Sequence, residues 1–192
     1  MTETEQLCRL VLVLLLVLTS TQSAWAAGPE SGLDALRKLL IERLALMEQV
    51  AAYKWNQRLP IDDPAREANV LNATLARSRA AGLDDGLARR FIVAQMEAAK
   101  FVQRYYFETW RKEGVETIAD VPDLKTNLRP RIGALSADLI VSVAESRSQS
   151  QSQLAACPAV SILMPVPEKL LRVPRAWAIA VKGVLGEQMV CS

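Results

Sequence analysis

Apolar residues recur every three to four positions along most of the chain, which is the spacing of one face of a helix. Breaks at Pro60, Gly82, Gly114 and Pro122 divide this pattern into segments. The segments predict helices over about residues 31–57, 64–81, 84–112, 124–147 and 168–188. Few stretches alternate apolar and polar residues as strands do. We therefore predict an all-α protein, a single-domain bundle of about five to six helices.

The N-terminal segment follows a different pattern. Residues 10–18 are all apolar, and a short polar stretch separates them from Ala-Trp-Ala at residues 24–26. A hydrophobic core followed by an A-x-A site is typical of a secretory signal peptide, and the core is shorter than the ~20 residues that cross a bilayer. The residues before it are not clearly basic, because Glu3 and Glu5 stand there. We predict that residues 1–26 are a signal peptide and that the mature chain is periplasmic or secreted.

Removal of the signal peptide also changes the cysteine count. Cys8 leaves with it, whereas Cys157 and Cys191 remain as an even pair. In an oxidising compartment we expect this pair to form a disulfide. The bond would close a loop of about 35 residues and stabilise the fold by roughly 3–4 kcal/mol. Two free buried thiols are the alternative.

Composition excludes several kinds of chemistry. Histidine is absent, which removes the commonest metal ligand and the usual proton shuttle at neutral pH. The formal net charge is only +2 and no basic cluster is present, so nothing in the chain matches a nucleic-acid backbone. No Gly-rich phosphate loop occurs either. We expect no metal, no cofactor, no nucleic-acid partner, and no membrane contact once the signal peptide is gone.

Two cations fall inside the apolar stripe of the first predicted helix. Arg43 and Lys54 are eleven residues apart, or three helical turns, so both point to the same side as Leu40 and Met47. Burying a charge without a partner costs several kcal/mol, so inward cations need anions to face. The alternative is that they reach the surface or pair with carboxylates of the protein.

Other polar side chains stand where they could turn inward from the second, third and fourth helices: Arg66 and Glu67, Gln103, and Arg129 or Arg131. A satisfied core glutamine and solvent-facing charges are the alternatives for these positions. Taken together, they describe a pocket with several cations, an amide and a carboxylate, suited to a small polyanion that carries a hydroxyl. No nucleophile with an adjacent base is present, so catalysis by orientation and electrostatics is the chemistry that remains.

The spacing of these residues resembles that of the all-helical chorismate mutases. Their active site contains an arginine, a lysine eleven residues later, Asp-x-x-Arg at nine and twelve residues beyond the lysine, and a distant glutamine. The matching residues here are Arg43, Lys54, Asp63, Arg66 and Gln103. The resemblance covers about residues 33–110, which is most of the predicted catalytic helices.

The export signal, the helices after residue 110 and the cysteine pair resemble the exported subclass, often called gamma. This resemblance implies one chorismate mutase domain over residues 27–192, with catalytic helices at about 31–147 and a disulfide-tied part at about 148–192. It also implies a homodimer with each active site inside one protomer. In that subclass an arginine of the fourth helix completes the site, which implies Arg129, with Arg131 as the alternative.

The resemblance implies a reaction as well as a fold. The reaction is the intramolecular Claisen rearrangement of chorismate to prephenate, an isomerisation in aromatic amino acid biosynthesis that uses no cofactor. By analogy with the family, Arg43 and Arg129 would hold the two substrate carboxylates, with support from Arg66.

The same analogy assigns the remaining contacts. Lys54 and Gln103 would donate hydrogen bonds to the ether oxygen, and Glu67 and the backbone near Asp63 would hold the ring hydroxyl. One position departs from the pattern: some members carry a small hydroxyl residue one turn before the glutamine, where this chain has Ala99. Next to it stands Lys100, whose direction the sequence does not determine.

Two other functions fit parts of the pattern. An isochorismate pyruvate-lyase shares the fold and the cationic pocket, but its usual setting is cytoplasmic. A non-catalytic exported helical domain that binds an aromatic acid or a partner protein belongs to another class.

Overall fold

The structure is a computed structural model that describes residues 32–148 and 157–186. All regular elements in these residues are helical, which confirms the all-α prediction. They are α2 (Gly32–Asn56), α3 (Pro64–Ala80), α4 (Asp85–Glu113), the π-helical turn η1 (Leu124–Leu128), α5 (Arg129–Ser148), α6 (Cys157–Leu163), the 3-10 turn η2 (Glu168–Leu170) and α7 (Pro174–Leu185). None of the helices in these two ranges has the length and apolar character needed to span a membrane.

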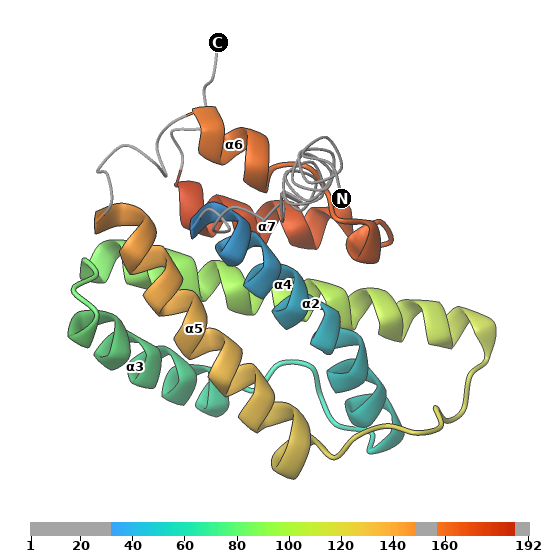
Figure 1. The fold of residues 1–192 in the computed structure, drawn as a ribbon. Coiled ribbons are helices and arrows are strands. Elements are labelled where there is room, and N and C mark those ends of the chain that lie inside the picture. The colour runs from blue at the N-terminus through green and yellow to red at the C-terminus, as the bar shows by residue number, and fades with distance from the viewer. Residues whose placement is uncertain (1–31, 149–156, 187–192) are drawn as a thin grey trace, which may run out of the picture. The chain divides into compact units, whose positions relative to one another are not determined.

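Helix α2 lies at the centre of the bundle and packs against both α4 and α5 (Figure 1). Its predicted apolar stripe is buried, with Leu36, Leu40 and Leu44 fully enclosed. Helix α3 rests on α4 and α5 and makes the fourth side of this group. Helices α3, α4 and α5 therefore surround the face of α2 on which Arg43 and Lys54 were predicted to point.

Local capping chemistry determines where α3 begins and where α4 ends. Asp63 caps α3 by accepting a hydrogen bond from the backbone N–H of Arg66 at 3.0 Å, and Pro64 occupies the first turn. Helix α4 ends at Gly114, whose φ of 67° lies in the left-handed region that favours glycine. Asn56 then ties the following loop to α2 through two hydrogen bonds with the backbone of Ile118, at 2.8 and 2.9 Å.

The C-terminal part differs from the prediction of one helix over about 168–188. The chain forms the short helix α6, the turn η2 and then α7, which begins at Pro174. Proline at that position lacks the N–H and fits only the first turn of a helix, so a helix starting at 168 cannot continue through it. Helix α7 packs along α4, and the fully buried Trp177 donates its indole N–H to the Leu163 carbonyl at 2.9 Å.

Three predictions stay untested, and each involves residues that the structure does not describe. The signal peptide at 1–26 lies in an undescribed range, and so does Cys191. Cys157 begins α6, but its side chain is not described, so the disulfide stays a prediction. The division of residues 27–192 into a catalytic part and a disulfide-tied part also stays a prediction.

Candidate active site

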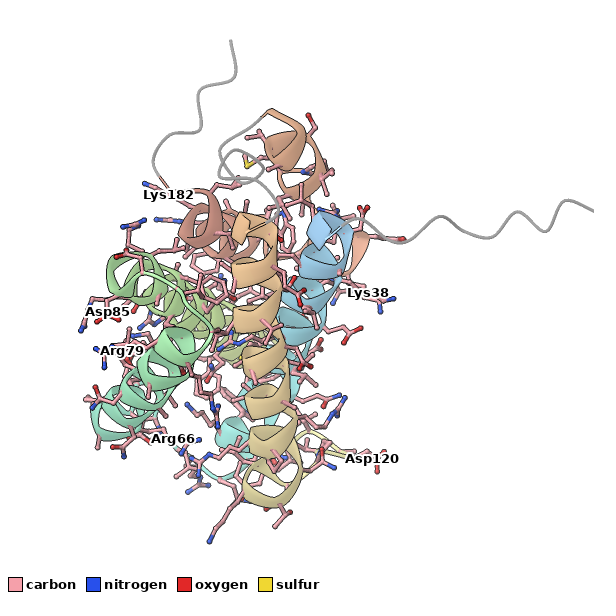
Figure 2. The ribbon with its side chains drawn as sticks, turned by 60° about the vertical axis from the view of Figure 1, so that its left-hand side comes forward. Lys38, Arg66, Arg79, Asp85, Asp120 and Lys182 are labelled. Atoms are coloured by element: carbon pink, nitrogen blue, oxygen red, sulfur yellow. The ribbon has the colours of Figure 1, made fainter. Side chains whose placement is uncertain are left out.

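A cavity of about 470 Å³ lies among α2, α3, α4 and the start of α5. This volume falls in the range of small-molecule sites. Its walls include all seven residues that the sequence proposed for catalysis or binding: Arg43, Lys54, Asp63, Arg66, Glu67, Gln103 and Arg129. Figure 2 shows Arg66 at the start of α3, and the exposed Arg79–Asp85 ion pair at the opposite end of that helix.

Arg43 projects from the middle of α2 and is only 6% exposed. Its guanidinium donates to Ser136 Oγ at 3.3 Å and to the Gln95 carbonyl at 3.1 Å, and no carboxylate of the described residues pairs with it. Burial lowers the pKa of Arg43 to about 10, so the side chain is still charged at neutral pH. A buried cation whose charge is not neutralised favours an anion in the cavity beside it.

Lys54 occupies the last turn of α2 and is half-buried. Its ammonium donates to the Ile61 carbonyl at 2.7 Å, which leaves two N–H donors for a ligand. Burial lowers the pKa of Lys54, and the nearby Asp63 carboxylate opposes this shift. The inward direction predicted for both α2 cations is therefore what the structure shows.

Gln103 lies on α4 and is 5% exposed. Its Nε2 donates to the Ala99 carbonyl at 3.1 Å and keeps a second N–H, whereas Oε1 has no partner among the described residues. A buried amide that is only partly satisfied differs from the core glutamine of the alternative interpretation. It has hydrogen-bonding capacity left for a ligand.

The first turn of α3 contributes a carboxylate whose position is defined by hydrogen bonds. Glu67 Oε1 accepts from the Asp63 backbone N–H at 3.3 Å, and Glu67 Oε2 accepts from Lys100 Nζ at 3.1 Å. Arg66 lines the same wall. The proline at the start of α3 and the Asp63 cap bring these side chains to the cavity together.

Of the two arginines at the start of α5, only Arg129 lines the cavity, while Arg131 is exposed to solvent. Sequence reasoning missed Ser136, which lies two turns after Arg129 and holds the Arg43 guanidinium. The seven-residue spacing from Arg129 was the available signal, because it places both residues on one face of a helix.

Cations dominate the charge of the cavity wall. Six cationic side chains line it: Arg43, Lys54, Arg66, Arg77, Lys100 and Arg129. Only two acidic side chains do so, Asp63 and Glu67. No group of three or more metal-ligating side chains occurs in the described parts of the chain. The site is therefore built for a small anion with hydrogen-bonding oxygens, held by fixed donors.

Comparison with known proteins identifies the family to which this helical chain belongs. Residues 34–104 match the family model described as chorismate mutase type II. The secreted chorismate mutase of Yersinia pestis is 30% identical over 145 residues, which are 76% of this chain and 77% of that protein. The chain belongs to the chorismate mutase family.

Solved structures agree with this assignment. The chorismate mutase of Burkholderia thailandensis is 30% identical and superposes with a TM-score of 0.69, over 81% of this chain and 99% of that one. The secreted chorismate mutase of Yersinia pestis superposes with a TM-score of 0.64 at 24% identity, over 78% of this chain and 94% of that one, and shows the same fold. Relatives named as secreted agree with the predicted export of this protein.

Proposed function

We propose that this protein is an exported chorismate mutase that converts chorismate to prephenate in the cavity among α2, α3, α4 and α5. The observation that carries the proposal is the buried Arg43, charged and without a carboxylate partner among the described residues, in a cavity whose other donors include Lys54 and Gln103. Chorismate carries two carboxylates, a ring hydroxyl and an enol ether oxygen. These groups match the charges and donors of the cavity wall.

The substrate carboxylates are assigned to the arginines. Arg43 and Arg129 each hold one carboxylate, and Arg66 adds positive charge from α3. Guanidinium groups bind carboxylates through paired N–H donors, so they fix orientation as well as charge. Holding both ends of the substrate favours the folded conformer in which the two reacting carbons meet.

The ether oxygen is assigned to Lys54 and Gln103. In the rearrangement the C–O bond of the ether breaks while a C–C bond forms, and no proton is transferred. Negative charge grows on the ether oxygen as its bond lengthens, and donors already in place stabilise that charge. Lys54 has two N–H groups left and Gln103 has one, so both meet this requirement.

The ring hydroxyl is assigned to Glu67 and the backbone near Asp63. Each oxygen of Glu67 already accepts one hydrogen bond, and each has a second lone pair that can accept the hydroxyl. The subclass resemblance also supports a homodimer in which each protomer contains a complete site.

The test is loss of the ultraviolet absorbance of chorismate on addition of the purified exported protein, with prephenate identified by acid conversion to phenylpyruvate. We expect rapid conversion by the wild type and little by Lys54→Ala. The exposed Lys112→Ala serves as the matched control. A folded protein that leaves chorismate intact would reject the proposal, and pyruvate released from isochorismate would indicate the lyase instead.

A further inference from the structure

Lys100 is a cavity residue to which the family pattern assigns no role. It follows Ala99 on α4, and its side chain is 15% exposed. Its ammonium lies 3.1 Å from Glu67 Oε2, 2.7 Å from Glu97 Oε1 and 3.6 Å from Asp62 Oδ1. One ammonium therefore joins three carboxylates.

Only one of these carboxylates faces the cavity. Glu97 is one turn before Lys100 on the same helix and is exposed, and it does not line the cavity. Asp62 is exposed as well and is also bound by Arg104, at 3.0 Å. Glu67 lines the cavity, so Lys100 connects the wall of the site to an acidic cluster outside it.

We propose that Lys100 is a positioning residue that holds the Glu67 carboxylate in the orientation needed to accept the ring hydroxyl of the substrate. This inference rests on the proposed function. The remaining bond to Glu67, from the Asp63 backbone N–H, is long at 3.3 Å and engages only the other oxygen. A glutamate side chain has several rotatable bonds, so one weak contact leaves the plane of its carboxylate poorly fixed.

The geometry favours this role over direct contact between Lys100 and the substrate. Two of the three ammonium N–H groups are used by Glu67 and Glu97, and Asp62 lies near the third. The hydrogen bonds that Lys100 donates to Glu97 and then to Glu67 raise its pKa despite its burial, so its charge persists through neutral pH. A charge already neutralised by the protein attracts a substrate carboxylate less than that of Arg43 does.

The experiment is a double-mutant cycle on chorismate conversion with Lys100→Met and Glu67→Gln. Lys100→Met keeps the length of the side chain and should lower kcat/KM about tenfold, mainly through KM, because a contact to the ring hydroxyl does not change during bond breaking. In the Glu67→Gln protein the same change should cost less than about twofold, since the residue it positions is already altered. Lys100→Arg should recover most of the loss.

The matched control is Glu97→Gln, which removes the shortest ion pair of Lys100 outside the cavity and should leave kcat/KM within about twofold. Losses that multiply in the double variant would mean that Lys100 contacts the substrate itself, and an unchanged KM in Lys100→Met would also overturn the inference. Thermal unfolding of each variant distinguishes a loss of folding from a misoriented Glu67 carboxylate. Lys100→Gln is the substitute if the methionine variant is unstable. Failure of the proposed function is distinct, because the wild type would then leave chorismate intact.

Discussion

Arg43 is the only buried charged residue among those that the structure describes, and its burial has a cost in stability. The guanidinium has lost water and has gained a serine hydroxyl and a backbone carbonyl, but no opposite charge from the part of the chain that the structure describes. Burying a charge without an ion-pair partner costs several kcal/mol, and an apolar side chain of similar length avoids that cost. Stability and function should therefore respond in opposite directions at this residue.

We predict that Arg43→Met lowers kcat/KM by at least about 10²-fold, while the free energy of unfolding stays equal or rises by about 1–2 kcal/mol. Urea unfolding and initial rates on the same preparations check this. The control is Arg131→Met, at an exposed position outside the cavity, which should change both quantities little. A strongly destabilised Arg43→Met protein would show that the guanidinium stabilises the fold and is not held available to bind an anion.

The protonation of Lys54 determines how activity should depend on pH. The protonated amine is the donor to the ether oxygen, and burial lowers its pKa below the ordinary lysine value. Activity is therefore present at pH values below that pKa and is lost as pH rises through it. We expect kcat/KM to be flat across neutral pH and to fall in the alkaline range before an ordinary lysine would titrate, at about pH 10.4. A steep change near pH 7, or none up to about pH 11, would contradict the role of Lys54.

At this scale the sequence predicts the inward cations but not their partners. Arg43, Lys54 and Gln103 are found by rotating a helix, because the period of a helix places them on the apolar face. Lys100 and Ser136 could not be assigned in the same way. Their roles depend on which side chains of the neighbouring helix lie opposite them, and this is determined by tertiary packing.

At the scale of elements, prediction succeeded where helix boundaries depend on local chemistry. The start of α3 at Asp63-Pro64 and the end of α4 at Gly114 follow from capping by one or two residues. The predicted helix over 168–188 was wrong in its first part, because Pro174 lacks the N–H that the interior of a helix requires. Helix α6, which contains a proline in its first turn, was not predicted, although that position tolerates proline.

The contact between α4 and α7 provides a stability test. A Cβ at Gly183 would overlap the Cβ of Ala94, so the two helices approach closely at this point. Gly183→Ala should lower the free energy of unfolding by about 1–3 kcal/mol, measured in urea, because the helices must separate. Gly133→Ala is the matched control, since a Cβ there meets nothing within 4 Å, and it should raise stability by about 0.5–1 kcal/mol. Equal effects of the two changes would contradict the close crossing.

At the scale of the whole molecule, the cavity is lined by residues from distant parts of the sequence. Residues from Arg43 on α2 to Ser136 on α5 surround it, so four helices far apart in sequence contribute to one site. The fold could be predicted as an all-α bundle because the helical period is strong, whereas the arrangement of the helices around the cavity came only through the family resemblance. Periodicity identifies the inner face of each helix but not the neighbour that covers it.

The subclass resemblance implies a homodimer with each active site inside one protomer, and the protomers of such a dimer cannot complement one another. Arg43→Met and Arg129→Ala should each lower activity at least about 10²-fold, because each removes a carboxylate ligand from the same cavity. The two variants, carrying different affinity tags, are expressed together and purified on both tags, so that any dimer isolated contains one copy of each. If the site lies within one protomer, this mixed protein has one cavity without Arg43 and one without Arg129, and it stays as inactive as the separate variants. If Arg129 entered the cavity of a partner, one of the two sites would combine two intact arginines, and about half of the wild-type activity would return.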